Sequence, residues 1–197
     1  MSPAISPFIL FFASVLTSNI LLANFLGMCS FVAISRDFKA ANGLGTAVVV
    51  VITISAAINW PLFHYVLVPL GLEYLRFIVF IVVIAAVVQV LEMLIDRLSP
   101  ALYMTLGIYL PLIVANCAVL GVILLLQLRN YNFLQSVVFG LGSGIGWWLA
   151  IISLAAIRKK VDASPVPAGL KGSGIVFITI GLMAMAFIGF SGMLVVQ

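Results

Sequence analysis

Six long apolar runs follow one another along the chain, and they constrain its fold more than any other feature. They cover residues 5–34, 41–68, 75–95, 101–127, 133–157 and 174–196. A bilayer core about 30 Å thick needs about 20 helical residues to cross it and offers no water to unpaired backbone groups. Only 7% of the 197 residues are charged, against roughly 25% in soluble domains. The runs therefore predict an all-α integral membrane protein with six transmembrane helices.

The basic residues predict how these helices are oriented. Connections one, three and five between the runs hold Arg36, Lys39, Arg97, Arg158, Lys159, Lys160 and Lys171. Connections two and four hold only Arg76 and Arg129, and the two tails hold none. Because short cytoplasmic loops carry the excess of Lys and Arg, we expect both termini on the outer side of the membrane. Most of these charges are interpreted as headgroup anchors, so the net charge of +4 does not predict nucleic-acid binding.

Two of the runs contain residues that interrupt helices. The first run is longer than one span requires, and the fourth contains a proline, which removes an amide donor and obstructs the helix. The residues concerned are Ser18, Asn19, Asn24 and Gly27 in the first run, and Gly107, Pro111, Asn116 and Gly121 in the fourth. The alternative for any single glycine is close helix packing. Together they predict that the first and fourth helices are broken.

Broken helices in corresponding positions are typical of inverted repeats. We expect one transmembrane domain over residues 1–197, made of two three-helix halves over about 1–98 and 99–197. Since three is an odd number of spans, the second half runs through the membrane upside down relative to the first. The two breaks then approach each other from opposite sides of the bilayer.

The only cysteines, Cys29 and Cys117, lie in these two interrupted runs. They predict a paired site near the membrane midplane. Inert buried cysteine and a disulfide are the structural alternatives. Thiolates also suit iron–sulfur clusters, zinc or cuprous ion, and a two-iron cluster normally takes four of them. If a cluster is present, half of its ligands must come from another polypeptide.

Candidates for ion coupling are fewer. Glu92 is an ionisable residue inside an apolar run, and Gln89 lies one turn before it on the same predicted helix face. The structural alternative is that Glu92 pairs with Arg97 or extends to the headgroups. Asn19, Asn24 and Asn116 have carbonyl oxygens for a sodium ion, but they can equally cap the broken helices. No motif distinguishes sodium from protons.

Five strings resemble one known family over nearly the whole chain. They are NFLGMCSF around Cys29, LGIYLPLIVANCAVLG around Cys117, VVQVLEML, FGLGSGIGWWLA and GLMAMAFIGFSGM. The family comprises the E subunit of the sodium-translocating NADH:quinone oxidoreductase and the A subunit of the Rnf ferredoxin:NAD oxidoreductase complex. NFLGMC, SPALY, GWWLAI and VPAGLKG resemble the first branch, whereas VPLGLEYLR and NCAVLGV resemble the second. The residue after Cys29 is not the proline expected of the Rnf pattern, which favours the first.

This resemblance implies a subunit of a bacterial inner-membrane translocase that is not catalytic alone. A 2Fe–2S cluster would be shared with a homologous membrane subunit of opposite topology, the D subunit of one complex or the E subunit of the other. Cys29 and Cys117 would be half of its ligands, with Gly27, Met28, Asn116 and Gly121 around them. Flavins would lie on other subunits. The complex would couple electron transfer to sodium or proton translocation.

Two other classes of protein remain compatible with these features. An inverted repeat with broken helices is also the architecture of a secondary transporter, and a membrane scaffold would leave the cysteines without a role. The chain contains no phosphate loop and no nucleophile with a base, so an independent enzyme is not predicted.

Overall fold

The computed structural model describes residues 6–98, 113, 116–165 and 172–189, and every regular element in these ranges is helical. The elements are α1 (Pro7–Phe12), η1 (Ala13–Thr17), α2 (Ile20–Asn24), α3 (Met28–Ile34), α4 (Phe38–Leu62), η2 (Phe63–Leu67), η3 (Glu73–Leu75), α5 (Arg76–Leu98), α8 (Cys117–Leu128), α9 (Phe133–Asp162) and α10 (Ser173–Ile188). Of these, η1 and η2 are π-helical and η3 is a 3-10 turn.

Three described helices are long and apolar enough to cross a bilayer: Phe38–Leu67, Glu73–Arg97 and Phe133–Asp162. Shorter apolar helices cover Pro7–Thr17, Cys117–Leu128 and Ser173–Ile188. The predicted all-helical membrane architecture is therefore confirmed. The count of six spans and the division into two inverted halves stay predictions, because the predicted breaks at Gly107 and Pro111 and the end of the sixth run lie outside the described residues.

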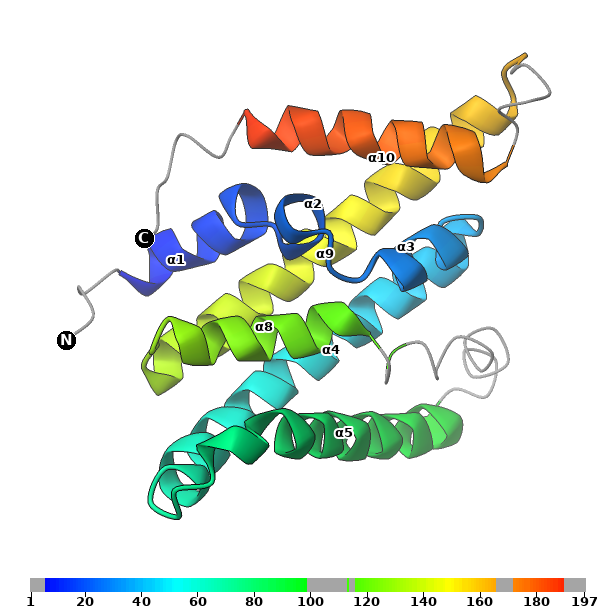
Figure 1. Ribbon diagram of the computed structural model, residues 1–197. Coiled ribbons are helices and arrows are strands. Elements are labelled where there is room, and N and C mark those ends of the chain that lie inside the picture. The colour runs from blue at the N-terminus through cyan, green and yellow to red at the C-terminus, as the bar shows by residue number, and fades with distance from the viewer. Residues whose placement is uncertain (1–5, 99–112, 114–115, 166–171, 190–197) are drawn as a thin grey trace.

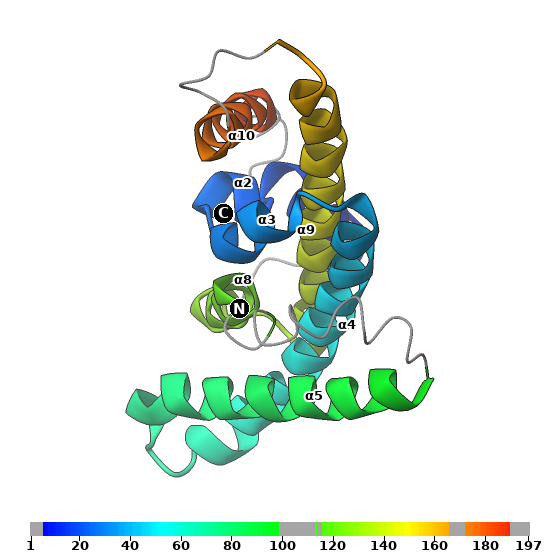
Figure 2. The same ribbon diagram turned by 90° about the vertical axis from the view of Figure 1, so that its right-hand side faces the viewer.

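The long helices α4 and α9 pack along each other and form one side of the molecule (Figures 1 and 2). In Figure 2, α3, α8 and α10 are seen almost end-on beside this pair. Helix α5 lies at the edge, next to α8 and α4. The core between these helices contains fully buried Phe31, Phe80, Phe139 and Trp147.

Glycines on α9 allow its neighbours to approach closely on two sides. They are Gly140, Gly142, Gly144 and Gly146. A Cβ at Gly144 would lie 2.9 Å from the Cα of Val49 on α4, and a Cβ at Gly146 would lie 2.9 Å from the carbonyl oxygen of Val15 on η1. Positions four apart share a helix face, so Gly140 and Gly144 face α4, while Gly142 and Gly146 face the first, broken segment.

The first run is broken, as predicted, and the breaks come at two places. Residues 18–19 separate η1 from α2, where the Asn19 side chain accepts from the Leu21 amide at 3.1 Å and donates to the Gly146 carbonyl at 2.9 Å. Residues 25–27 separate α2 from α3, with Phe25 at φ 54° and Gly27 at φ 87°. A capping side chain and left-handed residues are the usual ways to start and end helices.

A second helix begins inside the fourth run. Helix α8 starts at Cys117, and the Asn116 side chain accepts from the Ala118 amide at 3.0 Å. Asn116 therefore caps α8 in the same way as Asn19 caps α2. For these two asparagines the capping interpretation is confirmed.

The helix ends are sorted between two faces of the molecule (Figure 1). The α3–α4 junction, the carboxyl ends of α5 and α9 and the amino end of α10 lie at one face. The amino end of α1, the carboxyl end of α10 and the α4–α5 and α8–α9 connections lie at the other. The first face carries most of the basic residues, as the charge pattern predicts. Which face is cytoplasmic stays a prediction.

Candidate metal centre at Cys29 and Cys117

The structure brings the two cysteine-bearing segments into direct contact. The Gly27 backbone amide donates a hydrogen bond to Sγ of Cys117 at 2.9 Å, although the two residues are 90 positions apart in sequence. Gly27 directly precedes α3, whose second residue is Cys29, and Cys117 is the first residue of α8. Helices α3 and α8 therefore begin next to each other, about midway between the two faces of the molecule (Figure 1).

Both thiols are free and exposed on the surface of the chain. The expectation that inert cysteines would be buried in the core is therefore wrong as regards burial, whereas inertness of the two thiols stays an alternative. No group of three or more His, Cys, Asp or Glu side chains gathers anywhere in the described ranges. The donor set at this site is two soft sulfur ligands, which fits half of a four-thiolate site.

Gly27 is required by its backbone conformation and by its neighbours. Its φ of +87° lies in the left-handed region that favours glycine. A Cβ there would lie 2.7 Å from Nε1 of Trp147 and 3.0 Å from the Cβ of Ala118. The turn that directs the Gly27 amide at the Cys117 sulfur is therefore held between α8 and α9.

The other residues predicted around the thiols lie close by in the structure. Met28 is half-buried at the start of α3, and Asn116 is buried at the start of α8. Gly121 lies one turn after Cys117, where a Cβ would come 2.6 Å from Cδ1 of Leu26. Gly121 thus makes room for the loop before α3. A contribution of its amide to a sulfur stays a prediction.

Trp147 was not singled out by the sequence pattern. It is fully buried on α9, and its Nε1 has no hydrogen-bond partner in the described part of the chain. The Nδ2 of Asn116 also has none there. The only signal for Trp147 in the sequence is an aromatic pair directly after the glycine run of α9.

Arg158 differs from its expected role as a headgroup anchor. It lies within α9 and is buried, with Nη1 donating to Oγ of Ser35 at 2.8 Å and to the Val32 carbonyl at 3.3 Å. These acceptors lie at the carboxyl end of α3. For Arg158 the anchor interpretation is therefore wrong, since this side chain ties the cysteine-bearing helix α3 to α9.

The predicted ion-coupling residues lie on separate elements. Asn24 is exposed at the end of α2, whereas Gln89 is exposed and Glu92 half-buried on α5. In both overall views α8 lies between α2 and α5 (Figures 1 and 2). The structure therefore does not bring Asn24 together with the α5 pair, and their role in ion coupling stays a prediction.

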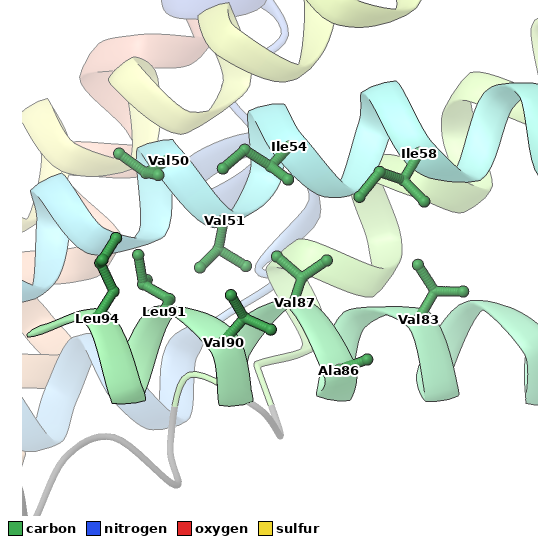
Figure 3. A pocket seen from close by; sticks show the side chains of 10 residues that line it. All are labelled: Val50, Val51, Ile54, Ile58, Val83, Ala86, Val87, Val90, Leu91 and Leu94. Atoms are coloured by element: carbon green, nitrogen blue, oxygen red, sulfur yellow. The ribbon is translucent and has the colours of Figure 1, made fainter.

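A groove between α4 and α5 is lined by apolar side chains alone (Figure 3). Its volume is about 470 Å³, and the lining residues are Val50, Val51, Ile54, Ile58, Val83, Ala86, Val87, Val90, Leu91 and Leu94. Gln89 and Glu92 are not among them. A groove without oxygen ligands is unsuited to a sodium ion.

Comparison with known proteins identifies the family. A family model described as "Rnf-Nqr subunit, membrane protein" matches residues 8–194. The chain belongs to the Rnf-Nqr family. The predicted family resemblance is thereby confirmed, and the match includes both cysteine-bearing segments.

Three relatives of this Rnf-Nqr chain are all named as the E subunit of the Na(+)-translocating NADH-quinone reductase. The proteins of Psychromonas ingrahamii and Pseudoalteromonas translucida are 51% and 52% identical to it over 193 residues. The protein of Idiomarina loihiensis is 50% identical over 193 residues. Each alignment covers 93% of this chain and 96% of the relative.

Proposed function

We propose that this chain is the E subunit of a sodium-translocating NADH–quinone reductase, in the inner membrane of a bacterium. The proposal is supported by relatives of that name at 50–52% identity over nearly their whole length. In this role the chain belongs to an oxidoreductase complex and has no catalytic activity alone. Other subunits bind the flavins.

We further propose that Cys29 and Cys117 hold half of a 2Fe–2S cluster, through which electrons cross the membrane. The contact between the Gly27 amide and Sγ of Cys117 carries this proposal, because it joins the two helices that begin at the thiols. Both thiols are exposed, so a second chain can reach them. A homologous D-type subunit of opposite topology supplies the other two thiolates.

Residues of this chain would have three different roles at such a site: ligand, hydrogen-bond donor and barrier to water. When bound, a 2Fe–2S cluster supplies a one-electron carrier. The two cysteine sulfurs act as ligands, and the Gly27 amide donates to one of them. Fully buried Ala118 and Val119 and the side chain of Leu26, packed against Gly121, keep water from the inner side. Hydrogen bonds to the sulfur atoms change the reduction potential of a cluster, and so does the exclusion of water from its surroundings.

Ion coupling and orientation complete the proposal. The basic face is cytoplasmic, and both termini lie outside. Glu92 with Gln89 on α5 and Asn24 on α2 are the candidates for interaction with the translocated sodium ion, on the general ground that polar groups inside a membrane are costly unless they function. The Rnf branch, with a ferredoxin:NAD reaction, is the alternative assignment within the family.

Iron content and low-temperature electron paramagnetic resonance on the complex, purified through this chain, test the proposal. Cys29→Ser and Cys117→Ser should each abolish one two-iron signal and electron transfer, while the other subunits still copurify. Ala33→Ser adds a hydroxyl at an exposed position of the same helix α3 and should leave the signal intact. An unchanged spectrum and iron count in both cysteine variants would contradict the cluster and favour the transporter or scaffold alternative.

A further inference from the structure

Two buried nitrogen donors without partners in the described ranges lie beside the cysteine contact. They are Nε1 of Trp147 and Nδ2 of Asn116, in residues that are 0% and 2% exposed. Both side chains border the same glycine: a Cβ at Gly27 would lie 2.7 Å from Trp147 Nε1 and 3.1 Å from Asn116 Oδ1. The Gly27 amide in turn donates to Cys117 Sγ. The Trp147 nitrogen from α9, the Asn116 side chain from the α8 cap and the amide of the turn before α3 therefore surround one glycine.

The chemistry of the missing partner follows from these atoms. An indole nitrogen can only donate, and the amide nitrogen of asparagine can only donate. The Oδ1 of Asn116 already accepts from the Ala118 amide, which fixes the amide group and leaves the nitrogen on its other side. A buried donor without an acceptor costs about 1–3 kcal/mol. Two such donors on side chains that border the same glycine indicate an electron-rich acceptor, since a further donor would satisfy neither.

We propose that Trp147 Nε1 and Asn116 Nδ2 donate hydrogen bonds to the anionic sulfur atoms at the cysteine site and thereby set its reduction potential. The inference rests on the proposed function, because neither nitrogen donates to a cysteine sulfur in the structure and the acceptors would be the sulfides of a bound cluster. Trp147 and Asn116 are positioning and tuning residues, not ligands. Hydrogen bonds to sulfur stabilise the more negative, reduced state, so their loss lowers the potential.

The chain offers a matched control for the tryptophan. Trp148 follows Trp147 on α9, but its Nε1 donates to Oδ1 of Asn42 on α4 at 3.2 Å. Trp147→Phe and Trp148→Phe therefore remove the same N–H group from adjacent positions, and only the first should affect the sulfur site. Asn116→Ser provides a second variant, because serine keeps an oxygen for the helix cap and lacks the amide donor.

The experiment is a redox titration of the purified complex followed by electron paramagnetic resonance, with pulsed measurements of exchangeable protons in H2O and D2O. Trp147→Phe and Asn116→Ser should each shift the midpoint to a more negative potential. The expected shift is about a tenfold change in the oxidised-to-reduced ratio at fixed potential, or about 59 mV for one electron. Trp147→Phe should also remove one exchangeable proton coupling, while Trp148→Phe should change neither quantity.

An intact cluster with wild-type midpoint and proton couplings in Trp147→Phe and Asn116→Ser would overturn the inference and leave the proposed function standing. A wild-type complex whose iron does not depend on Cys29 and Cys117 would overturn both. If one of the two variants fails to assemble, the midpoint potential of the other tests the inference: a more negative value supports it, and an unchanged or more positive value rejects it. An equal shift of the midpoint potential in Trp148→Phe would show that the shift comes from altered helix packing and not from a lost hydrogen bond, and it would also reject the inference.

Discussion

The Gly27 amide and the sulfur of Cys117 are 2.9 Å apart and joined by a hydrogen bond. This bond sets the position of α3 relative to α8 by contacts within the chain itself. The left-handed turn at Gly27 and the close approach of Trp147 hold the amide in place. The helices that carry the two thiols are therefore held together within the chain itself, which would reduce the ordering cost of completing the proposed shared site.

Gly27→Ala should destabilise the assembled protein by about 1–3 kcal/mol, since alanine is strained at positive φ and its Cβ would press on Trp147. The thermal midpoint of the purified complex measures the effect, and iron content should fall with it. Gly181→Ala is the matched control: this glycine lies inside α10, and a Cβ there meets nothing within 4 Å. Equal midpoints for the two variants would contradict the role of the Gly27 turn.

Arg158→Lys and Ser35→Ala should loosen the carboxyl end of α3. A hydrogen bond to a charged group contributes about 1.5–3 kcal/mol, and Ser35→Ala removes the 2.8 Å bond that Arg158 makes. Hydrogen exchange of the amides around Ser35 should become faster in both variants. Lys159→Ala removes an exposed neighbouring cation and should change little. An unchanged rate of amide hydrogen exchange in Ser35→Ala would show that the hydrogen bond between Arg158 and Ser35 does not hold the end of α3 in place.

Cysteines placed at opposite faces of the molecule should react from opposite sides of the membrane. Lys160→Cys lies at the basic end of α9, and Glu73→Cys lies at the α4–α5 connection. A membrane-impermeant maleimide should label Glu73→Cys in spheroplasts and Lys160→Cys in inverted vesicles, because basic connections stay in the cytoplasm. The unaltered chain controls for Cys29 and Cys117. The reverse pattern would invert the proposed topology.

Glu92→Gln should reduce the sodium transported per electron at least several-fold while electron transfer continues. The reason is that an ionisable side chain part-way along a spanning helix is costly unless it serves transport. Sodium uptake and quinone reduction by the complex in proteoliposomes give the ratio. Asp96→Asn, an exposed position one turn later, should leave it unchanged. A wild-type ratio in Glu92→Gln would assign Glu92 a structural role.

The long helices were predictable from the sequence to within a few residues. The run 133–157 corresponds to α9, and the run 75–95 corresponds to α5, because uninterrupted apolar residues of sufficient length have few alternatives in a bilayer. The break in the first helix was also predictable, since Asn19 and Gly27 are poor residues for an uninterrupted span. The places of Cys29 and Cys117 in two interrupted runs also predicted that their segments meet, as the contact of Gly27 with Cys117 shows; a site shared by both thiols stays a prediction.

The sequence could not predict which polar groups meet across the fold. Arg158 looks like any other basic residue at a helix end, and only its contact with Ser35 distinguishes it from Lys159. Trp147 and Trp148 are adjacent and identical, yet one nitrogen faces Gly27 and the other bonds to Asn42. Such assignments depend on how helices distant in sequence rotate against each other, which hydrophobic periodicity alone does not specify.

The alternating glycines of α9 determine where this protein can move. With α4 on one side and the η1 segment on the other, rotation of α9 would bring larger side chains into either contact. Tightly packed contacts of this kind resist gradual deformation. Helices α4 and α9, with the segment around η1, should therefore move as one rigid frame during turnover. We expect any conformational change that accompanies ion release to consist of movements of the outer helices α5 and α10.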